Sequence, residues 1–265
     1  MLVRHHVYRL LQRAAVSAGL LPTVPKVHTF ALKPEEIAKL RSGVTNDMQR
    51  AFFGGTKRPV YKWSHYLDIY ERHLSTYRGT PLFFLEIGVS AGGSLEMWRR
   101  FFGAKATIVG IDIDEACQSR VDPPNVVRIG SQTDPPFLQK VVDEFGPPDV
   151  ILDDGSHIGS HQQKSFETLF PRLKEGGLYM IEDMHTSYWP DWEGGYRRKG
   201  SAIEYVKQMI DDLHAWYHNR PTASPARDEI NAIHIYDSVV VLEKRRKSRP
   251  GFLEAHGLGT QSSNG

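Results

Sequence analysis

The chain has 265 residues, with 33 Lys and Arg against 31 Asp and Glu, and a single cysteine. This length fits one α/β domain with short extensions. A formal net charge of +2 argues against a nucleic-acid partner or an anionic membrane surface. Because Cys117 has no second cysteine to pair with, we expect a reducing, cytoplasmic location. No uncharged apolar run reaches the roughly 18 residues of a membrane span, so we also expect a soluble protein.

The two ends of the chain differ from its middle. Residues 3–18 place apolar side chains on one face of a helix that also carries arginines. We expect a packing or oligomer-contact helix there, with membrane-surface contact or a transit peptide as alternatives. The sequence predicts a helical arm over residues 1–57, a main domain over 58–245 and a flexible tail over 246–265. The expected assembly is a homo-oligomer, with a dimer as the first choice.

Between these ends, buried strands alternate with amphipathic helices. Helical spacing of apolar residues predicts helices over 63–77, 94–102, 137–145, 166–170 and 203–217. Short apolar runs predict parallel strands over 81–87, 107–111, 125–129, 150–152 and 178–181. A short turn makes the last two strands, 230–236 and 239–243, antiparallel. The sequence therefore predicts an α/β fold with a doubly wound, mostly parallel seven-stranded sheet, Rossmann-like, and a C-terminal antiparallel hairpin.

The loop after the first strand carries the first functional signal, Glu86-Ile-Gly-Val-Ser-Ala-Gly-Gly-Ser94. In a dinucleotide fingerprint the second glycine lets the backbone approach a pyrophosphate, but Ser90 stands at that position. Glu86 suits an ammonium group better than a phosphate, and Asp112, at the end of the second strand, suits ribose hydroxyls. Together these residues favour S-adenosylmethionine as the ligand. Ser94 is the expected N-cap of the following helix.

Pairs of acidic residues follow two buried strands, Asp153-Asp154 after the fourth and Glu182-Asp183 after the fifth. If these strands are neighbours, about 4.8 Å apart, four carboxylates crowd one edge of the sheet. Such crowding requires protons or a cation. Oxygen ligands favour Mg²⁺, with Mn²⁺ or Ca²⁺ as alternatives. Alternatively, one or two of these acids cap a helix or bind the cofactor.

A histidine, His157, follows Asp154 by three residues. Its imidazole can act as a general base near neutral pH, although a lone loop histidine can also be an ordinary polar residue. His161, in the following helix, and His185, two residues after the second acidic pair, compete for this role.

Three stretches resemble class I S-adenosylmethionine-dependent methyltransferases, and more narrowly the metal-dependent sugar O-methyltransferases of the mycinamicin and macrocin type. They are Phe84-Leu-Glu-Ile-Gly-Val-Ser-Ala-Gly-Gly-Ser-Leu, Ile151-Leu-Asp-Asp-Gly-Ser-His and Gly177-Leu-Tyr-Met-Ile-Glu-Asp-Met-His-Thr-Ser-Tyr-Trp. The segment from Lys62 to His73 resembles the lead-in helix of that family. The resemblance covers roughly residues 58 to 244. The sequence differs from the family pattern in one respect. The macrolide-sugar enzymes carry a sizeable additional N-terminal domain, whereas this chain has about 57 residues ahead of the matching region.

The resemblance implies a role for each matching residue. It implies His157 and Asp154 as catalytic residues, the first as general base, and Asp154, Glu182 and Asp183 as metal ligands. The cofactor-binding residues lie at the ends of the strands: Glu86, Gly88, Ser90, Ser94, Asp112, Ser131, Gln132 and Asp153. Within that set Gly88, Ser90 and Ser94 line the methionine part, Asp112 the ribose, and Ser131 and Gln132 the adenine. Asp153 lies between the methionine part and the metal.

The expected function is Mg²⁺-dependent transfer of a methyl group from S-adenosylmethionine to a sugar hydroxyl. The acceptor is a mannose, methylmannose or rhamnose-type saccharide, or a glycosylated natural product. A NAD-dependent oxidoreductase and a non-catalytic binding module of the same fold are the alternatives. An iron site built from His157, His185 and one carboxylate is a third.

Overall fold

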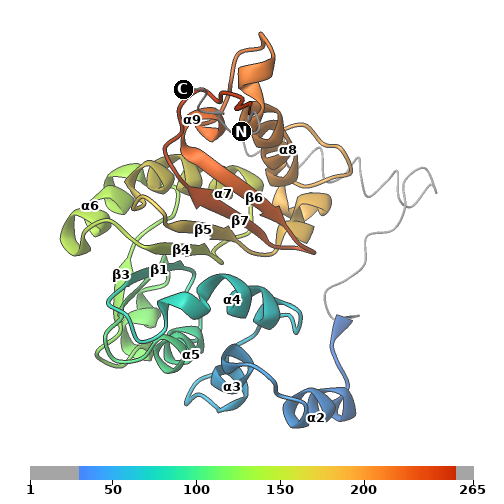
Figure 1. Cartoon of the computed structure of the whole chain (residues 1–265). Coiled ribbons are helices and arrows are strands. Elements are labelled where there is room, and N and C mark those ends of the chain that lie inside the picture. Colours follow the sequence, from blue (N-terminus) through green and yellow to red (C-terminus); the bar gives the residue numbers. More distant parts are fainter. Residues whose placement is uncertain (1–29, 255–265) are drawn as a thin grey trace, which may run out of the picture.

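A seven-stranded sheet lies between two layers of helices in the computed structural model, which describes residues 30–254 (Figure 1). The strand order is β3-β2-β1-β4-β5-β7-β6. The strands are β1 (Phe83–Ile87), β2 (Thr107–Asp112), β3 (Val126–Ile129), β4 (Val150–Asp153), β5 (Leu178–Ile181), β6 (Ile230–Ile235) and β7 (Val240–Lys244). The first five are parallel, whereas β7 is antiparallel to both β5 and β6. The predicted doubly wound sheet and C-terminal hairpin are confirmed.

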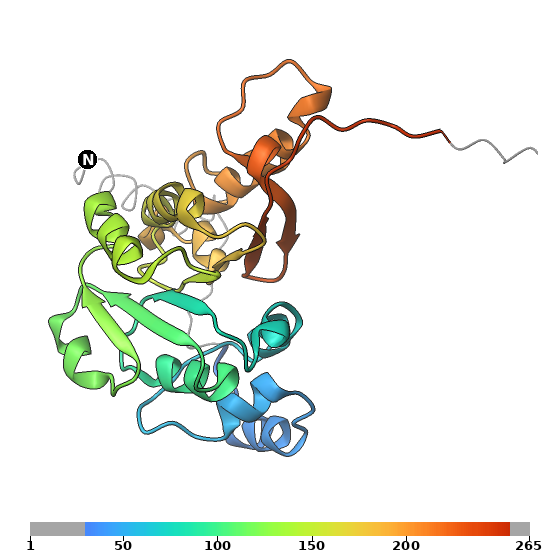
Figure 2. The same cartoon turned by 60° about the vertical axis from the view of Figure 1, so that its left-hand side comes forward.

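The helices divide between the two faces of the sheet (Figures 1 and 2). One face is covered by α3 (Asp47–Phe53), α4 (Tyr66–Leu74) and α5 (Gly93–Phe102), with α2 (Pro34–Ser42) preceding them. The other is covered by α6 (Pro135–Phe145), α7 (Gly159–Leu169) and α8 (Ala202–Leu213), and the short α9 (Ala226–Glu229) leads into β6. The expected cap of α5 is wrong. Its N-cap is Gly92, because the Ser94 hydroxyl donates instead to the buried Glu86 carboxylate, at 2.8 Å.

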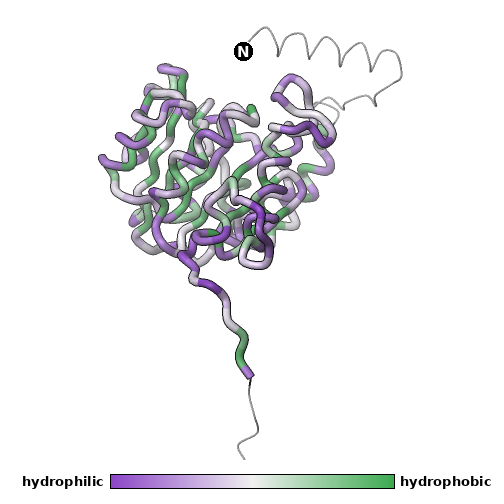
Figure 3. Tube along the Cα trace, turned by 90° about the horizontal axis from the view of Figure 1, so that it is seen from above, coloured by the Kyte–Doolittle hydropathy of each residue, from purple (hydrophilic) through white to green (hydrophobic). Residues whose placement is uncertain are grey.

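Successive side chains along each strand point to opposite faces of the sheet, so a separate hydrophobic core forms on each face. Phe84 and Leu152 face the α4 side, whereas Leu85 and Ile151 face the α7 side. A side chain buried to this degree contributes about 1.5–3 kcal/mol relative to an exposed one. Figure 3 shows hydrophobic stretches inside the body and hydrophilic ones on its outer turns. The two cores fix the positions of the strand ends, where the candidate site lies.

The segments before α4 and after β7 correspond to the predicted N-terminal arm and C-terminal tail. Met48 and Ala51 of α3 are buried in the same core as α4 and α5. The helix expected over residues 3–18 lies outside the described residues. After β7, the backbone NH groups of residues 245–247 still donate to Glu229, Glu175 and Asp228, and the chain then extends away without regular structure up to residue 254 (Figure 2). The boundaries at residues 58 and 245 stay predictions. Within residues 30–254, no helix has both the length and the apolar character that crossing a membrane requires.

Gly88 lets the loop after β1 pass directly against the loop after β4. Its φ is +95°, and a Cβ at this position would lie 2.0 Å from the backbone oxygen of Asp154. Both the left-handed backbone and the close approach require glycine. Since Gly88 NH also donates to Ile111 O, at 2.8 Å, this loop is tied to β2 as well as to β4.

We expect Gly88→Ala to lower the free energy of unfolding by more than Gly103→Ala does. Gly103 has a φ of +86° and a ψ of −173°, but a Cβ added there would meet nothing within 4 Å, so it carries only the conformational cost, about 1–3 kcal/mol. The alanine at residue 88 adds a clash with backbone. Urea unfolding of the two variants measures the difference, and equal losses would contradict the steric argument.

Candidate active site

A cavity of about 620 Å³ lies at the carboxyl ends of the parallel strands. This is where ligands bind in open α/β sheets, and the volume is that of a small-molecule site. Nine of the residues predicted for the site line it: Gly88, Ser90, Ser94, Asp112, Ser131, Gln132, Asp154, His157 and Asp183. The remaining three, Glu86, Asp153 and Glu182, are buried beneath it.

Asp153 and Asp154 point to opposite faces of the sheet. Because strand residues alternate, Asp153 faces α7 and accepts hydrogen bonds from the hydroxyls of Ser165 and Tyr179. Burial raises the pKa of Asp153 to about 6. The strands β4 and β5 are neighbours, as the prediction of a crowded edge required. The predicted crowding of four carboxylates therefore reduces to three: Asp154, Glu182 and Asp183.

Glu86 lies under the glycine loop and not on the cavity surface. Its carboxylate accepts hydrogen bonds from Ser94 Oγ at 2.8 Å and from Trp98 Nε1 at 3.0 Å. Burial raises the pKa of Glu86 to about 7, against the opposing effects of Lys62 and these hydrogen bonds. In this structure its contacts hold α5 against β1.

Asp112 organises the backbone of the cofactor loop. Its Oδ2 accepts hydrogen bonds from the NH groups of Val89, at 2.8 Å, and Ser90, at 2.9 Å. Burial raises the pKa of Asp112, but backbone donors from Asp114, Ser90 and Val89 outweigh it and lower the pKa. The carboxylate is thus ionised, and it lines the cavity where a ribose was predicted.

Lys62 joins two of the three crowded carboxylates and was missed by the sequence analysis. Its Nζ donates to Asp154 Oδ2 at 2.6 Å and to the two Glu182 oxygens at 2.8 and 3.0 Å. Its side chain is only 2% exposed. Burial lowers the pKa of Lys62, but Asp154, Glu182 and Glu86 more than reverse this and raise it. The site therefore contains a buried ammonium group that compensates part of the negative charge.

Helix α4 and the turn before it supply further donors. Tyr66 OH donates to Asp183 Oδ1 at 2.8 Å, and Trp63 Nε1 donates to the same atom at 3.2 Å. Tyr70 OH donates to Glu182. These three aromatics lie within the helix predicted over residues 63–77, with no role in the site expected of them. The signal for such a role is chemical, since a buried tyrosine hydroxyl needs a polar partner.

His157 lies beside the acids, as predicted. Its Nε2 is 3.4 Å from Asp183 Oδ2 and 4.0 Å from Asp154 Oδ1. Its Nδ1 is buried and has no hydrogen-bond partner among the described residues. Ligand atoms of Asp154, His157 and Asp183 all lie within 4.8 Å of one another. This group contains His157 in place of the predicted Glu182, which is held by Lys62 and Tyr70.

Three residues of the site have left-handed backbones: Ser90 (φ +49°), His157 (φ +56°) and Asp183 (φ +55°). For a non-glycine residue this conformation costs on the order of 1–3 kcal/mol and persists only where surrounding contacts enforce it. Tyr66 enforces it at Asp183, since its hydroxyl also accepts from Asp183 NH at 3.2 Å. The strain turns the Asp183 carboxylate back toward the cavity.

The two competing histidines lie at the margin of the acid group. His161 Nδ1 is 2.8 Å from Ser156 Oγ. His185 Nδ1 lies against Ser238 Oγ and is 3.9 Å from Asp183 Oδ1. Because His185 is outside the group of converging ligand atoms, the geometry does not favour a two-histidine iron site. Its ring instead packs between Trp63 and Trp189, with centroids 5.2 and 4.7 Å away.

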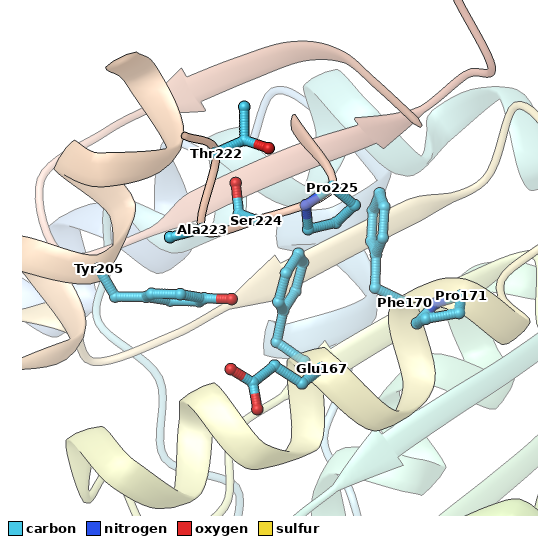
Figure 4. A pocket seen from close by; sticks show the side chains of 9 residues that line it. Glu167, Phe170, Pro171, Tyr205, Thr222, Ala223, Ser224 and Pro225 are labelled. Atoms are coloured by element: carbon cyan, nitrogen blue, oxygen red, sulfur yellow. The ribbon is translucent and has the colours of Figure 1, made fainter. Parts of the chain in front are cut away.

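A second hollow of about 390 Å³ lies on the α7 and α8 side, next to residues 222–225 (Figure 4). Its nine lining residues include one charged side chain, Glu167, and rings such as Phe170 and Tyr205. Catalysis usually requires several converging polar groups, so the cavity at the strand ends is the candidate active site.

Comparisons with known proteins agree with this geometry. A family model described as a methyltransferase domain matches residues 85–184. The 8-demethyl-8-alpha-L-rhamnosyl tetracenomycin-C 2'-O-methyltransferase of Streptomyces olivaceus is 36% identical over 203 residues, 72% of this chain and 53% of that protein. The mycinamicin VI 2''-O-methyltransferase of Micromonospora griseorubida is 38% identical over 196 residues, 69% of this chain and 48% of that protein.

Among solved structures, MycE methyltransferase from the mycinamycin biosynthetic pathway, in complex with Mg and SAH, is 34% identical with a TM-score of 0.65. The match covers 77% of this chain and 55% of that one. The strand order and the site define a class I methyltransferase fold. The chain carries a class I methyltransferase domain and is similar to these sugar O-methyltransferases over about 70% of its own length. It spans about half the length of the curated relatives it matches.

We expect Lys62→Met to unfold at a lower temperature in chelator and to gain more from added Mg²⁺ than the wild type does. Removing one partner of a buried ion pair costs about 3–5 kcal/mol, because the other charge stays buried and unpaired. A divalent cation then supplies the missing positive charge. Thermal unfolding with and without Mg²⁺ measures this. Lys57→Met, at a side chain that is 78% exposed, is the matched control, and equal Mg²⁺ shifts in all three proteins would contradict the expectation.

Proposed function

We propose that this chain transfers a methyl group from S-adenosylmethionine to a hydroxyl of a sugar, with Mg²⁺ at the acid group. The observation that carries the proposal is a shared cavity. Asp154, His157 and Asp183 line the same cavity as the glycine loop, so a cofactor at the loop and an acceptor at the acids are neighbours. The activity of the named relatives supports the reaction class.

The cofactor part of the proposal rests on the loop between β1 and α5. Asp112 offers an ionised carboxylate to ribose hydroxyls, and the Ser131 and Gln132 segment lies beyond it at the end of β3. A structure of a relative that holds SAH supports S-adenosylmethionine over a nicotinamide cofactor. Glu86 and Asp153 take part from beneath the surface, through the loops that they hold in place.

The charge of the acid group fits a divalent cation. Burial and the neighbouring Asp154 raise the pKa of Glu182 well above its ordinary value, so the protein alone disfavours three ionised carboxylates beside one Lys62 ammonium. A bound divalent cation would balance the two excess negative charges. Asp154 and Asp183 already converge, whereas Glu182 is held by Lys62 and Tyr70. A ligand set of Asp154, Glu182 and Asp183 therefore requires the Lys62 ammonium to move from Glu182. A bound Mg²⁺ supplies stabilisation for the negative charge that develops on an acceptor oxygen.

His157 is the proposed general base. The acceptor hydroxyl gives its proton to His157 Nε2, the oxygen forms a bond to the methyl carbon, and the bond from that carbon to sulfur breaks, which releases S-adenosylhomocysteine. Nε2 is the ring nitrogen that faces Asp154 and Asp183. One nitrogen cannot bind a metal and accept a proton at once, so this role requires that His157 is not a metal ligand.

The proposed acceptor is a rhamnose-type or related sugar on a natural product. Rings of Trp63, His185, Trp189 and Trp192 follow one another away from the acid group. These rings do not line the cavity, and Trp189 is only 8% exposed. The row forms an apolar wall next to the acid group, against which we place the sugar ring. The names of the relatives support a glycoside acceptor. A homodimer and a cytoplasmic location remain predictions from the sequence.

Calorimetric titration of S-adenosylhomocysteine, with Mg²⁺ and with chelator, tests the cofactor and metal together. We expect cofactor binding in both buffers and a separate Mg²⁺ binding heat, which Asp183→Asn removes because it replaces a charged ligand oxygen with an amide. Methyl transfer to rhamnosyl glycosides should stop in chelator. Absence of cofactor binding would overturn the proposal, and full activity in chelator would remove the metal from it.

We expect His157→Ala to keep the affinities for S-adenosylhomocysteine and Mg²⁺ and to lower kcat at least about 100-fold, the usual contribution of a positioned base. His214→Ala, at an exposed histidine at the end of α8, is the matched control and should leave kcat unchanged. A loss of the Mg²⁺ binding heat in His157→Ala would instead make His157 a metal ligand. A loss of kcat of only a few fold would refute the base.

A further inference from the structure

A second group of ligand-type side chains lies outside the active site, where α4 meets the C-terminal hairpin. It consists of His73 at the end of α4, His234 on β6 and Glu243 on β7. One ligand atom from each lies within 4.8 Å of the other two. Two imidazoles and one carboxylate from three different elements thus converge on one point.

The fold brings these three side chains together through its regular periodicities. Glu243 pairs with Ala232 across the hairpin, so His234, two residues further along β6, projects on the same face of the sheet. On α4, His73 follows Tyr66 and Tyr70 by seven and three residues, which puts it on the face that packs toward the sheet. The convergence therefore follows from the register of the hairpin and from the packing of α4.

The contacts within the group are those of an organised site. His234 Nε2 is 2.7 Å from Glu243 Oε1, and His73 Nε2 is 2.9 Å from the hydroxyl of Tyr236. The two imidazole rings have centroids 4.8 Å apart. Asn231 Nδ2 donates to the other oxygen of Glu243 at 3.0 Å, which fixes the orientation of that carboxylate. His234 and Glu243 are 35% and 33% exposed, so an ion can enter from solvent.

We propose that His73, His234 and Glu243 bind a divalent transition metal, with Zn²⁺ as the first choice. Imidazole nitrogen is a preferred ligand for zinc, copper and nickel, whereas Mg²⁺ and Ca²⁺ prefer oxygen. Two nitrogens and one carboxylate oxygen are a known zinc ligand set, in which a fourth position stays open. Tetrahedral zinc bonds of about 2.0–2.2 Å place ligand atoms roughly 3.4 Å apart. His234 Nε2 and Glu243 Oε1, at 2.7 Å, must therefore separate, and ligand atoms that lie up to 4.8 Å apart must move closer together. This inference does not rest on the proposed function.

Such a metal would hold α4 to the hairpin. The same helix presents Tyr66 and Tyr70 to the active-site carboxylates, and the turn of the same hairpin presents Ser238 to His185. The site is therefore placed to stabilise the position of both elements without touching the reacting groups.

Co²⁺ added to the full chain tests the site, because Co²⁺ replaces Zn²⁺ and absorbs visible light strongly in a tetrahedral site. We expect one absorbing Co²⁺ per chain, displaced by Zn²⁺, with an affinity that falls at least about tenfold in His73→Ala and in His234→Ala. His214→Ala should keep the wild-type affinity. The variant His157→Ala should keep it as well, since that change removes a ligand atom only from the active-site group.

Glu243→Gln serves if either alanine variant fails to fold, because it keeps the shape of the side chain and removes its charge. A Zn²⁺-dependent rise in Tm in the wild type that is reduced in Glu243→Gln would support the site. Two results would overturn it. One is no tetrahedral Co²⁺ spectrum in the wild type, and the other is a spectrum lost in His157→Ala but kept when His73 or Glu243 is changed.

Discussion

The interaction on which the rest of the site depends is the buried salt bridge from Lys62 to Asp154 and Glu182. Parallel strands carry these two acids to adjacent positions on the same face of the sheet. Glu182 is 1% exposed, and its burial, together with the neighbouring Asp154, raises its pKa well above the ordinary value. The Lys62 ammonium lies between them, 2.6 Å from Asp154 Oδ2 and 2.8 Å from Glu182 Oε2, and offsets their mutual repulsion. Since Lys62 shortly precedes α4, this pairing also fixes where that helix begins relative to β4 and β5.

The site is assembled from both halves of the sheet. The glycine loop of β1 approaches the end of β4 closely enough to exclude a Cβ, which joins the cofactor cavity to Asp154. On the other side, Tyr66 and Ser238 hold Asp183 and His185. The left-handed backbones at Ser90, His157 and Asp183 lie where these two halves meet. Three of the six non-glycine residues with a positive φ within residues 30–254 are therefore residues that would bind or react.

Much of this was readable from the sequence, for a physical reason. Parallel strands buried on both faces are short apolar runs, so their positions and the acids that follow them could be assigned closely. The directions of side chains could not be, because they depend on where each strand ends. The side chains of adjacent residues such as Asp153 and Asp154 thus point to opposite faces of the sheet. Lys62 has no local pattern at all; its partners are 92 and 120 residues away in the sequence and meet it only through packing.

The order of strands also shapes how the chain is made. Strand β5 pairs on one side with β4 and on the other with β7, which is separated from it by 58 residues. During synthesis β5 is consequently an open edge for the whole time that residues 182–239 are being added. An unpaired strand edge is a template for pairing with another chain. Until the last hairpin is made, the nascent protein therefore leaves open to pairing with another chain the very strand that leads into Glu182 and Asp183.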